Sequence, residues 1–314
     1  MSAAAPRVVL TSLAQAEALV EGDGLDLVAV ALIVSEALGE DLGGRGVLPP
    51  GSGAGLDVTS VATIDADARA RGRFVARRPG TVAGLSVAAY VVALVAGPAG
   101  GVEIGLRSRD GDRVEVGDVL LEVVGNTRAL LQAERIALNL LTLMSGTATA
   151  TRAWVDALEG SGARVRDSRK TVPGLRMLQK YAVRVGGGVN HRMSLADAAL
   201  IKDNHVLAAG GVVPAFTRVR EAFPDVWVQV EVTTAAQARD VVAAGATDVL
   251  LDNMSLEQMA AIVAELRGRC TFEASGGLTL DTAIAVGSTG VDFLAVGAIT
   301  HSAPILDIAM DLDG

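Results

Sequence analysis

The second half of the chain repeats a unit of one short apolar segment followed by one helical pattern, and this repeat restricts the fold more than any other feature. The apolar segments lie at residues 228–232, 248–253, 270–277 and 292–298. Successive segments end about 20–24 residues apart, which suits one strand and one helix per unit. Because apolar strands that alternate with helices are typical of parallel sheets, we expect an α/β fold.

Helical patterns at residues 234–244, 255–266 and 279–286 fill the intervals between these strands. The strands end in polar or very small residues. In α/β barrels the loops after the strands form the active site, and the last two loops often bind phosphate through backbone N–H groups. We therefore predict a complete or partial barrel. A doubly wound open sheet is the alternative, and the lack of a GxGxxG motif after a first strand disfavours it.

The first half of the chain has a less regular pattern. Residues 26–38 and 129–145 predict amphipathic helices, and the second of these is expected to open a second domain. Short strand-like segments lie at residues 71–78, 102–108 and 112–125. The first domain is thus expected to mix strands and helices.

Two segments of the first half need separate treatment. Residues 81–102 carry no charge, but their uninterrupted apolar part covers residues 85–96. That is shorter than the roughly 20 residues that span a bilayer, so we expect a buried helix. Residues 43–57 are rich in Gly and Pro and predict a surface loop without a catalytic role.

Composition limits the class of function. The net charge is −9 and the pI is near 4.9, which argues against a general nucleic-acid or anionic-membrane surface. The single cysteine, Cys270, excludes an internal disulfide and a multi-cysteine metal site, and it indicates a reducing compartment. The N-terminus lacks the pattern of a signal peptide. We expect a cytoplasmic protein.

Residues 164–205, here called the cationic segment, depart from this acidic background. They hold nine Lys and Arg against three Asp, and they include every lysine of the chain: Lys170, Lys180 and Lys202. A cationic region in an acidic protein predicts an anionic ligand.

Several residues of the cationic segment are candidates for contact with that ligand. Arg169 and Arg192 suit bidentate binding of carboxylates. Lys202 ends an apolar strand and is either a ligand contact or a Schiff-base nucleophile. His191 and His205 are further candidates, as is His301 beyond the segment. Lys180 and Arg184 are spaced as the exposed face of a helix.

Two carboxylates, Glu231 and Asp252, occupy equivalent positions at the ends of successive strands. They are suited to bind Mg²⁺, to hold ribose hydroxyls, or to stabilise positive charge on a sugar carbon. Asp252 could instead cap the next helix, but Ser255 is better placed for that role. Glu273 also lies near a strand end, and its orientation relative to Ser275 is left open.

In these motifs the chain resembles quinolinate phosphoribosyltransferases, also called nicotinate-nucleotide pyrophosphorylases (carboxylating). The resemblance covers residues 133–149, 167–205, 231–234, 250–255, 273–278 and 292–304. It implies an N-terminal α/β sandwich followed by an incomplete α/β barrel. We place these domains at residues 1–137 and 138–305, with a tail at residues 306–314 that packs back on the first domain.

The resemblance also implies a reaction and a set of site residues. The reaction joins quinolinate to phosphoribosyl pyrophosphate with Mg²⁺ and gives nicotinate mononucleotide, pyrophosphate and CO₂. The quinolinate side would be lined by Arg135, Ser168, Arg169, Lys170, His191, Arg192 and Lys202. The ribose and metal side would use Glu231 and Asp252, with Lys170, Glu231 and Asp252 as the catalytic residues. The 5′-phosphate would lie on Ser275, Gly276, Gly277, Val296, Gly297 and Ala298.

Within such a family Arg135 would reach the site of a partner subunit, which implies a homodimer. Ser168 and Val172 stand where members commonly carry threonine; Ser168 keeps a hydroxyl and Val172 does not. Three other readings stay open: a related phosphoribosyltransferase for a different base, a Schiff-base aldolase that uses Lys202, and a non-catalytic phosphate-binding protein.

Overall fold

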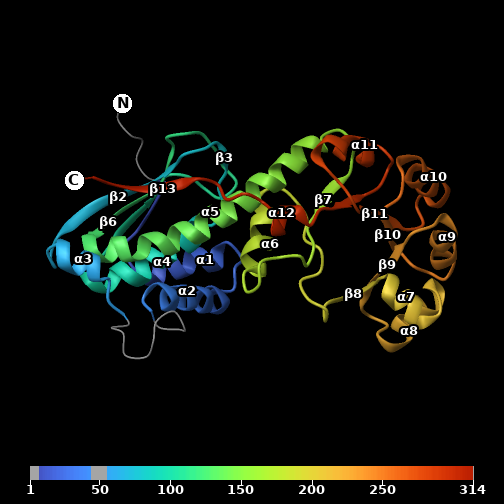
Figure 1. Ribbon diagram of the computed structural model, residues 1–314, viewed down its shortest axis with the longest axis horizontal. Helices are drawn as coiled ribbons and strands as arrows, with labels where there is room; N and C mark the ends of the chain where they lie inside the picture. The colour runs from blue at the N-terminus through green and yellow to red at the C-terminus, as the bar shows by residue number, and fades with distance from the viewer. Residues whose placement is uncertain (1–6, 44–54, 314) are drawn as a thin grey trace. The chain divides into compact units, whose positions relative to one another are not determined.

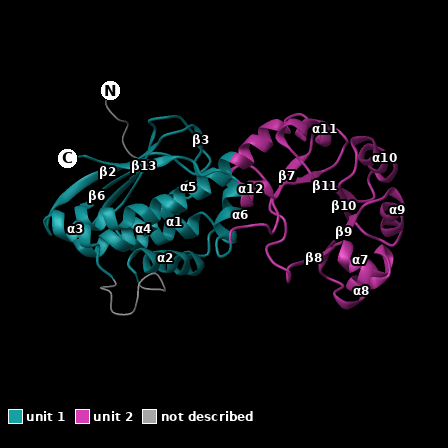
Figure 2. Ribbon diagram, viewed as in Figure 1, with its two compact units in different colours: residues 1–149, 173–185, 303–314 teal, residues 150–172, 186–302 magenta. Residues whose placement is uncertain are grey.

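The computed structural model describes residues 7–43 and 55–313, which form two compact units. Unit 1 comprises residues 1–149, 173–185 and 303–314, and unit 2 comprises residues 150–172 and 186–302 (Figure 2). The chain therefore passes between the units four times. Most of the loop expected at residues 43–57 lies outside the described residues.

Unit 1 contains an antiparallel sheet with helices packed on it (Figure 1). In sheet order, its strands are β1 (Val8–Leu10), β4 (Glu103–Leu106), β6 (Val119–Asn126), β2 (Arg69–Ala76) and β13 (Ile308–Asp313). β3 (Gly80–Thr81) and β5 (Arg113–Val114) form a separate two-stranded pair. The helices are α1 (Leu13–Gly22), α2 (Leu27–Asp41), α3 (Val58–Thr63), α4 (Leu85–Ala96), η1 (Gly97–Ala99), α5 (Thr127–Ala157) and α6 (Arg176–Val185).

Helix α4 forms the centre of the core of unit 1. Ten of its residues are buried, and it contacts α1, β4 and β6. The uncharged segment thus forms the buried helix that its length predicts, and no helix of the described residues is long and apolar enough to cross a membrane. Residue 149 lies inside α5, so this helix contributes to both units.

Unit 2 is built on a parallel sheet. In sheet order, its strands are β7 (Arg164–Arg166), β12 (Phe293–Ala295), β11 (Thr271–Ser275), β10 (Asp248–Asp252), β9 (Trp227–Val232) and β8 (Ala198–Ile201). The helices are α7 (Asp203–Ala209), α8 (Val212–Ala222), α9 (Ala235–Ala243), α10 (Leu256–Leu266), η2 (Leu280–Thr282), α11 (Ala283–Gly287) and α12 (Ala298–His301).

The strand order distinguishes the two predicted architectures. Strands β8 to β12 follow one another in chain order, and the earlier β7 then pairs with the last strand, β12. A doubly wound sheet would reverse direction at a switch point, whereas a barrel runs in one direction until its first and last strands meet. Val189 adds a single parallel bridge on the other side of β7, and no ladder joins β7 to β8 among the described residues. Unit 2 is an open barrel, as predicted.

One expectation for the cationic segment is wrong. Arg184 is exposed as expected, but Lys180 is 0 % exposed. Helix α6 belongs to unit 1, and its residues 178–183 are all buried, so the middle of the helix is covered on every side. Lys180 and Arg184 share one face, as their i, i+4 spacing predicts, but only Arg184, in the last turn, reaches the surface.

Candidate active site

The loop after β7 carries the first group of predicted site residues. The Ser168 hydroxyl accepts a hydrogen bond from the Lys170 amide at 3.1 Å, so this hydroxyl shapes the turn that presents Arg169 and Lys170. Thr300 Oγ1 donates to the Lys170 carbonyl at 2.7 Å and is 2 % exposed. Thr300, which was not among the predicted residues, thus connects this loop to α12.

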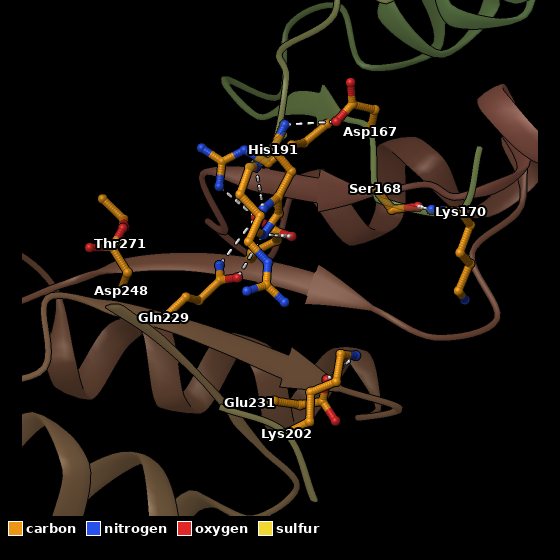
Figure 3. Close-up of polar contacts among 12 residues, drawn as sticks. Asp167, Ser168, Lys170, His191, Lys202, Gln229, Glu231, Asp248 and Thr271 are labelled. Carbon is orange, nitrogen blue, oxygen red and sulfur yellow. Dashed lines mark hydrogen bonds and ion pairs between the residues drawn. The ribbon is translucent and has the colours of Figure 1, made fainter. Parts of the chain in front are cut away.

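Asp167 holds the loop that carries His191 and Arg192 against the loop after β7. It is 0 % exposed, and one of its carboxylate oxygens accepts from the His191 amide at 2.7 Å (Figure 3). The other oxygen accepts from Asn190 Nδ2 at 2.6 Å. A buried carboxylate that accepts several hydrogen bonds holds its donors in one arrangement. His191 and Arg192 are therefore held beside the strand that supplies Arg169.

His191 is held by the protein at both ring nitrogens. Nδ1 accepts from the Arg192 amide at 2.7 Å, and Nε2 lies 2.9 Å from Gln229 Oε1. The Trp227 ring packs against its edge at 5.5 Å. Direct contact between His191 and a substrate stays a prediction, because both nitrogens already have partners in this state.

Arg169 and Arg192 are close enough to repel one another. Burial lowers the pKa of Arg192, and the positive charge of Arg169 lowers it further. Arg192 Nη1 donates to the Ala198 carbonyl at 2.7 Å, and Arg169 Nε is buried without a hydrogen-bond partner. Two partly buried guanidinium groups that repel each other are stabilised by an anion bound between them.

Lys202 and Glu231 form an ion pair between the ends of β8 and β9. Lys202 Nζ lies 2.9 Å from Glu231 Oε2 (Figure 3). The Lys202 side chain is half exposed, whereas that of Glu231 is 10 % exposed. His205 Nδ1 accepts from the Lys202 amide at 3.0 Å, so His205 caps the start of α7. The structure thus brings together two residues that we had placed on opposite sides of the ligand.

Asp252 lies beside a tight glycine turn. Asn253 Nδ2 donates to Asp252 Oδ2 at 2.7 Å, and Ser255 caps α10 as expected. Gly276 has a φ of +93°, and a Cβ at this position would meet Asn253 Oδ1 at 2.2 Å. The loops after β10 and β11 therefore touch, which requires glycine at position 276.

The loop after β12 packs against Lys170. A Cβ at Gly297 would lie 3.1 Å from Lys170 Cδ and 3.2 Å from His301 Cδ2, so this glycine leaves room for both side chains. The Val296 amide donates to the Arg166 carbonyl at 2.9 Å and is thus already bonded within the protein. Of this predicted phosphate loop, Gly297 and Ala298 remain the better candidates for binding phosphate.

Unit 2 thus contains every predicted site residue except Arg135, which is exposed on α5 in unit 1. Of two buried residues of unit 2, Gln229 was missed and the orientation of Glu273 was left open. Gln229 and Glu273 are each 1 % exposed, and each lies two residues before a predicted site residue on the same strand, Glu231 and Ser275. Because side chains two apart in a strand share a face, this alternation could have revealed them.

The described residues contain no group of three or more His, Cys, Asp or Glu side chains arranged to hold a metal ion. Glu231 and Asp252 are two carboxylates at the ends of neighbouring strands. Mg²⁺ is commonly bound by one or two carboxylates together with substrate phosphates and water. The pair therefore fits a cation that enters with a phosphorylated ligand.

The chain matches two family models. Residues 57–145 match "Quinolinate phosphoribosyl transferase, N-terminal domain", and residues 147–311 match the C-terminal domain of the same description. The chain belongs to this family.

Relatives and solved structures agree with the family models. A nicotinate-nucleotide pyrophosphorylase [carboxylating] of Mycobacterium leprae is 50 % identical over 261 residues, which cover 82 % of this chain and 92 % of the relative. The crystal structure of NadC from Streptococcus pyogenes has a TM-score of 0.84 and 38 % identity, and the match covers 92 % of this chain and 97 % of that one. The nicotinate-nucleotide pyrophosphorylase structure from Francisella tularensis has a TM-score of 0.81 at 33 % identity, over 91 % and 96 % of the two chains.

Proposed function

We propose that the chain transfers the phosphoribosyl group of phosphoribosyl pyrophosphate to quinolinate, with loss of CO₂, to give nicotinate mononucleotide and pyrophosphate. The observation that carries this proposal is the pair Arg169 and Arg192, whose mutual repulsion depresses the pKa of Arg192 beyond the effect of burial. A dicarboxylate relieves that repulsion, since each guanidinium can pair with one carboxylate.

The second half of the site suits the phosphoribosyl group. Glu231 and Asp252 lie at the mouth of the barrel, where they can accept hydrogen bonds from ribose hydroxyls. The glycine turn at Gly276 and Gly277 has positive φ at both residues, so its backbone can approach a phosphate without a side chain in the way. Gly297 and Ala298 would complete this phosphate cradle.

Mg²⁺ is part of the proposal. Glu231 and Asp252 would hold it together with pyrophosphate oxygens, and the bound ion would neutralise negative charge on the leaving group. Lys202 would then exchange its ion pair with Glu231 for contact with quinolinate. Lys170, whose side chain lies beside Gly297, would act on the charged groups of either substrate.

The chain's own contribution to the chemistry is electrostatic. The pyridine nitrogen of quinolinate forms a bond to the ribose carbon as the bond to pyrophosphate breaks, and positive charge develops on the sugar. The carboxylates Glu231 and Asp252 stabilise that charge. The C–CO₂ bond then breaks, and its electron pair stays on the ring carbon beside the positive nitrogen until a proton is added. Fixed cations and a fixed nitrogen–carbon alignment lower both barriers.

The ion pair of Lys202 disfavours the aldolase alternative. A Schiff-base lysine must be free to attack a carbonyl carbon, whereas Lys202 Nζ is engaged by Glu231 at 2.9 Å. A phosphoribosyltransferase for a different base is the second candidate. It is disfavoured because a base with one carboxylate would leave Arg169 or Arg192 without a partner.

The proposal extends to assembly and location. Arg135 is exposed on α5 in the single chain, which suits a role at a partner's site in a homodimer. A cytoplasmic location is supported by the presence of one cysteine in the chain, Cys270.

A product assay tests the function. The purified protein is incubated with quinolinate, phosphoribosyl pyrophosphate and Mg²⁺, and nicotinate mononucleotide and CO₂ are measured. We expect both products in equal amounts, and none when the Mg²⁺ is chelated. Turnover of nicotinate but not quinolinate would disprove the assignment of the substrate.

A further inference from the structure

Four side chains of unit 2 form a chain of polar contacts that ends at the loop carrying Arg192. We call it the barrel network, and its members are Arg166, His191, Gln229 and Glu273. His191 Nε2 lies 2.9 Å from Gln229 Oε1, and Gln229 Nε2 donates to Glu273 Oε2 at 3.2 Å (Figure 3). Arg166 Nη1 donates to the same Glu273 oxygen at 2.6 Å. The network joins β7, β9 and β11 to the loop that carries Arg192.

The contacts of the barrel network determine the proton position on His191. Nδ1 accepts from the Arg192 amide, so Nδ1 has no proton. The proton is then on Nε2, which donates to Gln229 Oε1. The Gln229 amide is oriented in turn, because Glu273 accepts from its nitrogen. The donor and the acceptor of each hydrogen bond are thus fixed. They follow from the carboxylate of Glu273, which can only accept.

The barrel network is costly to bury, which indicates that it has a use. Glu273 is 1 % exposed, and its Oε1 has no hydrogen-bond partner and lies 3.8 Å from His191 Nε2. Arg166 is stacked on the Phe293 ring at 3.5 Å. An apolar core would be at least as stable as a buried ion pair of this kind.

We propose that Gln229 and Glu273 are positioning residues that aim Arg192 at one carboxylate of the dicarboxylate substrate; this rests on the proposed function. Glu273 orients Gln229, Gln229 holds the His191 ring, and the ring fixes the amide of Arg192. The guanidinium of Arg192 is anchored on its far side by the Ala198 carbonyl. Neither Gln229 nor Glu273 needs to touch the substrate for this effect.

An exchange of amide and carboxylate tests the proposal. Gln229→Glu places a second carboxylate against Glu273, so we expect the KM for quinolinate to rise at least tenfold while the KM for phosphoribosyl pyrophosphate changes less than twofold. The double variant Gln229→Glu/Glu273→Gln keeps an acceptor for His191 and restores a donor between the two positions. We expect it to return the quinolinate KM to within about threefold of the wild-type value.

Thr271→Val is the matched control. Thr271 lies on the same strand as Glu273, at its other end, and donates to Asp248 at 2.5 Å. Its loss should lower the melting temperature without changing either KM. If Gln229→Glu raises both KM values alike, or if the double variant does not recover, the barrel network is merely structural and the proposal fails.

A second readout is independent of activity. The chain has three histidines, so ¹⁵N-histidine spectra can be assigned by single substitutions of His205 and His301. We expect His191 to show an unprotonated Nδ1 and an Nε2–H protected from exchange, and Gln229→Leu to remove that protection. The opposite tautomer in the wild type would overturn the proposal. If only the proposed function is wrong, His191 should still show the expected tautomer, but the protein should not turn over quinolinate.

Discussion

One carboxylate of each unit, Asp110 and Glu273, shows how differently polar groups are used in the two units. In unit 1, Asp110 lies in the loop between β4 and β5, beside the start of α4, and accepts from the amides of Gly84 and Leu85 at 2.6 and 3.0 Å and from the Tyr181 hydroxyl at 2.8 Å. In unit 2, Glu273 lies within a strand and is paired with Arg166. Asp110 accepts hydrogen bonds from backbone amides at the start of a helix, which have no partner within that helix. Glu273 instead places a charge in a position that an apolar residue could fill. The difference indicates that the interior of unit 1 serves stability and that of unit 2 serves ligand binding.

The largest expected effect tests the interior of unit 1. Phe74 on β2 is 0 % exposed, and Phe74→Ala should cost about 3–5 kcal/mol of unfolding free energy through lost contacts and the remaining cavity. Urea denaturation measures this loss, and Phe74→Leu should cost less. Activity per folded molecule should stay within twofold; a selective rise in one KM would contradict the division between stability and binding.

A substitution of Arg192 in unit 2 should change activity and not stability. Arg192→Ala should lower kcat/KM for quinolinate about 100-fold, equivalent to about 2.7 kcal/mol, because one carboxylate loses its guanidinium partner. Its melting temperature should not fall, since repulsion by Arg169 is removed. Arg192→Lys keeps the charge but not the bidentate geometry and should recover part of the loss. The matched Glu231→Ala should act on the phosphoribosyl substrate instead, and the reverse pattern would refute our assignment of the two halves.

The glycine turn offers a smaller, paired test. A Cβ at Gly276 would meet Asn253 Oδ1 at 2.2 Å, whereas one at Gly277 meets nothing within 4 Å. Both residues have positive φ, so each change to Ala introduces backbone strain of about 1–2 kcal/mol. Gly276→Ala should raise the KM for phosphoribosyl pyrophosphate about tenfold more than Gly277→Ala does. Equal effects would show that strain, not contact with Asn253, governs this turn.

The smallest effect concerns Asp110 and pH. Burial raises the pKa of Asp110 above 3.8, despite the hydrogen bonds that lower it. The folded chain therefore binds this proton more tightly than the unfolded chain, so wild-type stability rises as pH falls through the raised pKa towards 3.8. Asp110→Asn removes this contribution, and its stability relative to wild type should decline over the same interval. Denaturation curves at a series of pH values measure the difference, and parallel curves would exclude the raised pKa.

The sequence predicted the parts of the fold that depend on local pattern. Strands β9 to β11 and helices α9 and α10 are recognisable because apolar spacing changes from strand to helix within each repeat. The tail at residues 306–314 was expected to pack on the first domain, but its pairing with β2 as strand β13 was not, since that pairing joins residues more than 200 positions apart. The burial of Lys180 was not predicted for a similar reason. The charge of the cationic segment does not show that α6 belongs to unit 1.

The candidate site was recognisable where charge and strand ends coincide, as for Arg169, Lys202 and Glu231. The residues that support it were harder to find. Gln229 carries no charge, and the role of Glu273 depends on its contacts with Gln229 and Arg166, which lie on other strands. Thr300 acts on Lys170 across 130 residues of sequence. Supporting contacts of this kind follow from tertiary structure and not from local pattern.

The pairing of β13 with β2 also affects how the protein is made. During synthesis on the ribosome, β2 emerges early, but its partner β13 (Ile308–Asp313) emerges more than 200 residues later. Until then the edge of β2 has open backbone groups that can pair with a neighbouring nascent chain. A protein shortened by those residues would keep the whole of unit 2 and still expose that edge. Its principal defect would therefore be aggregation during expression, before any loss of catalysis could be measured.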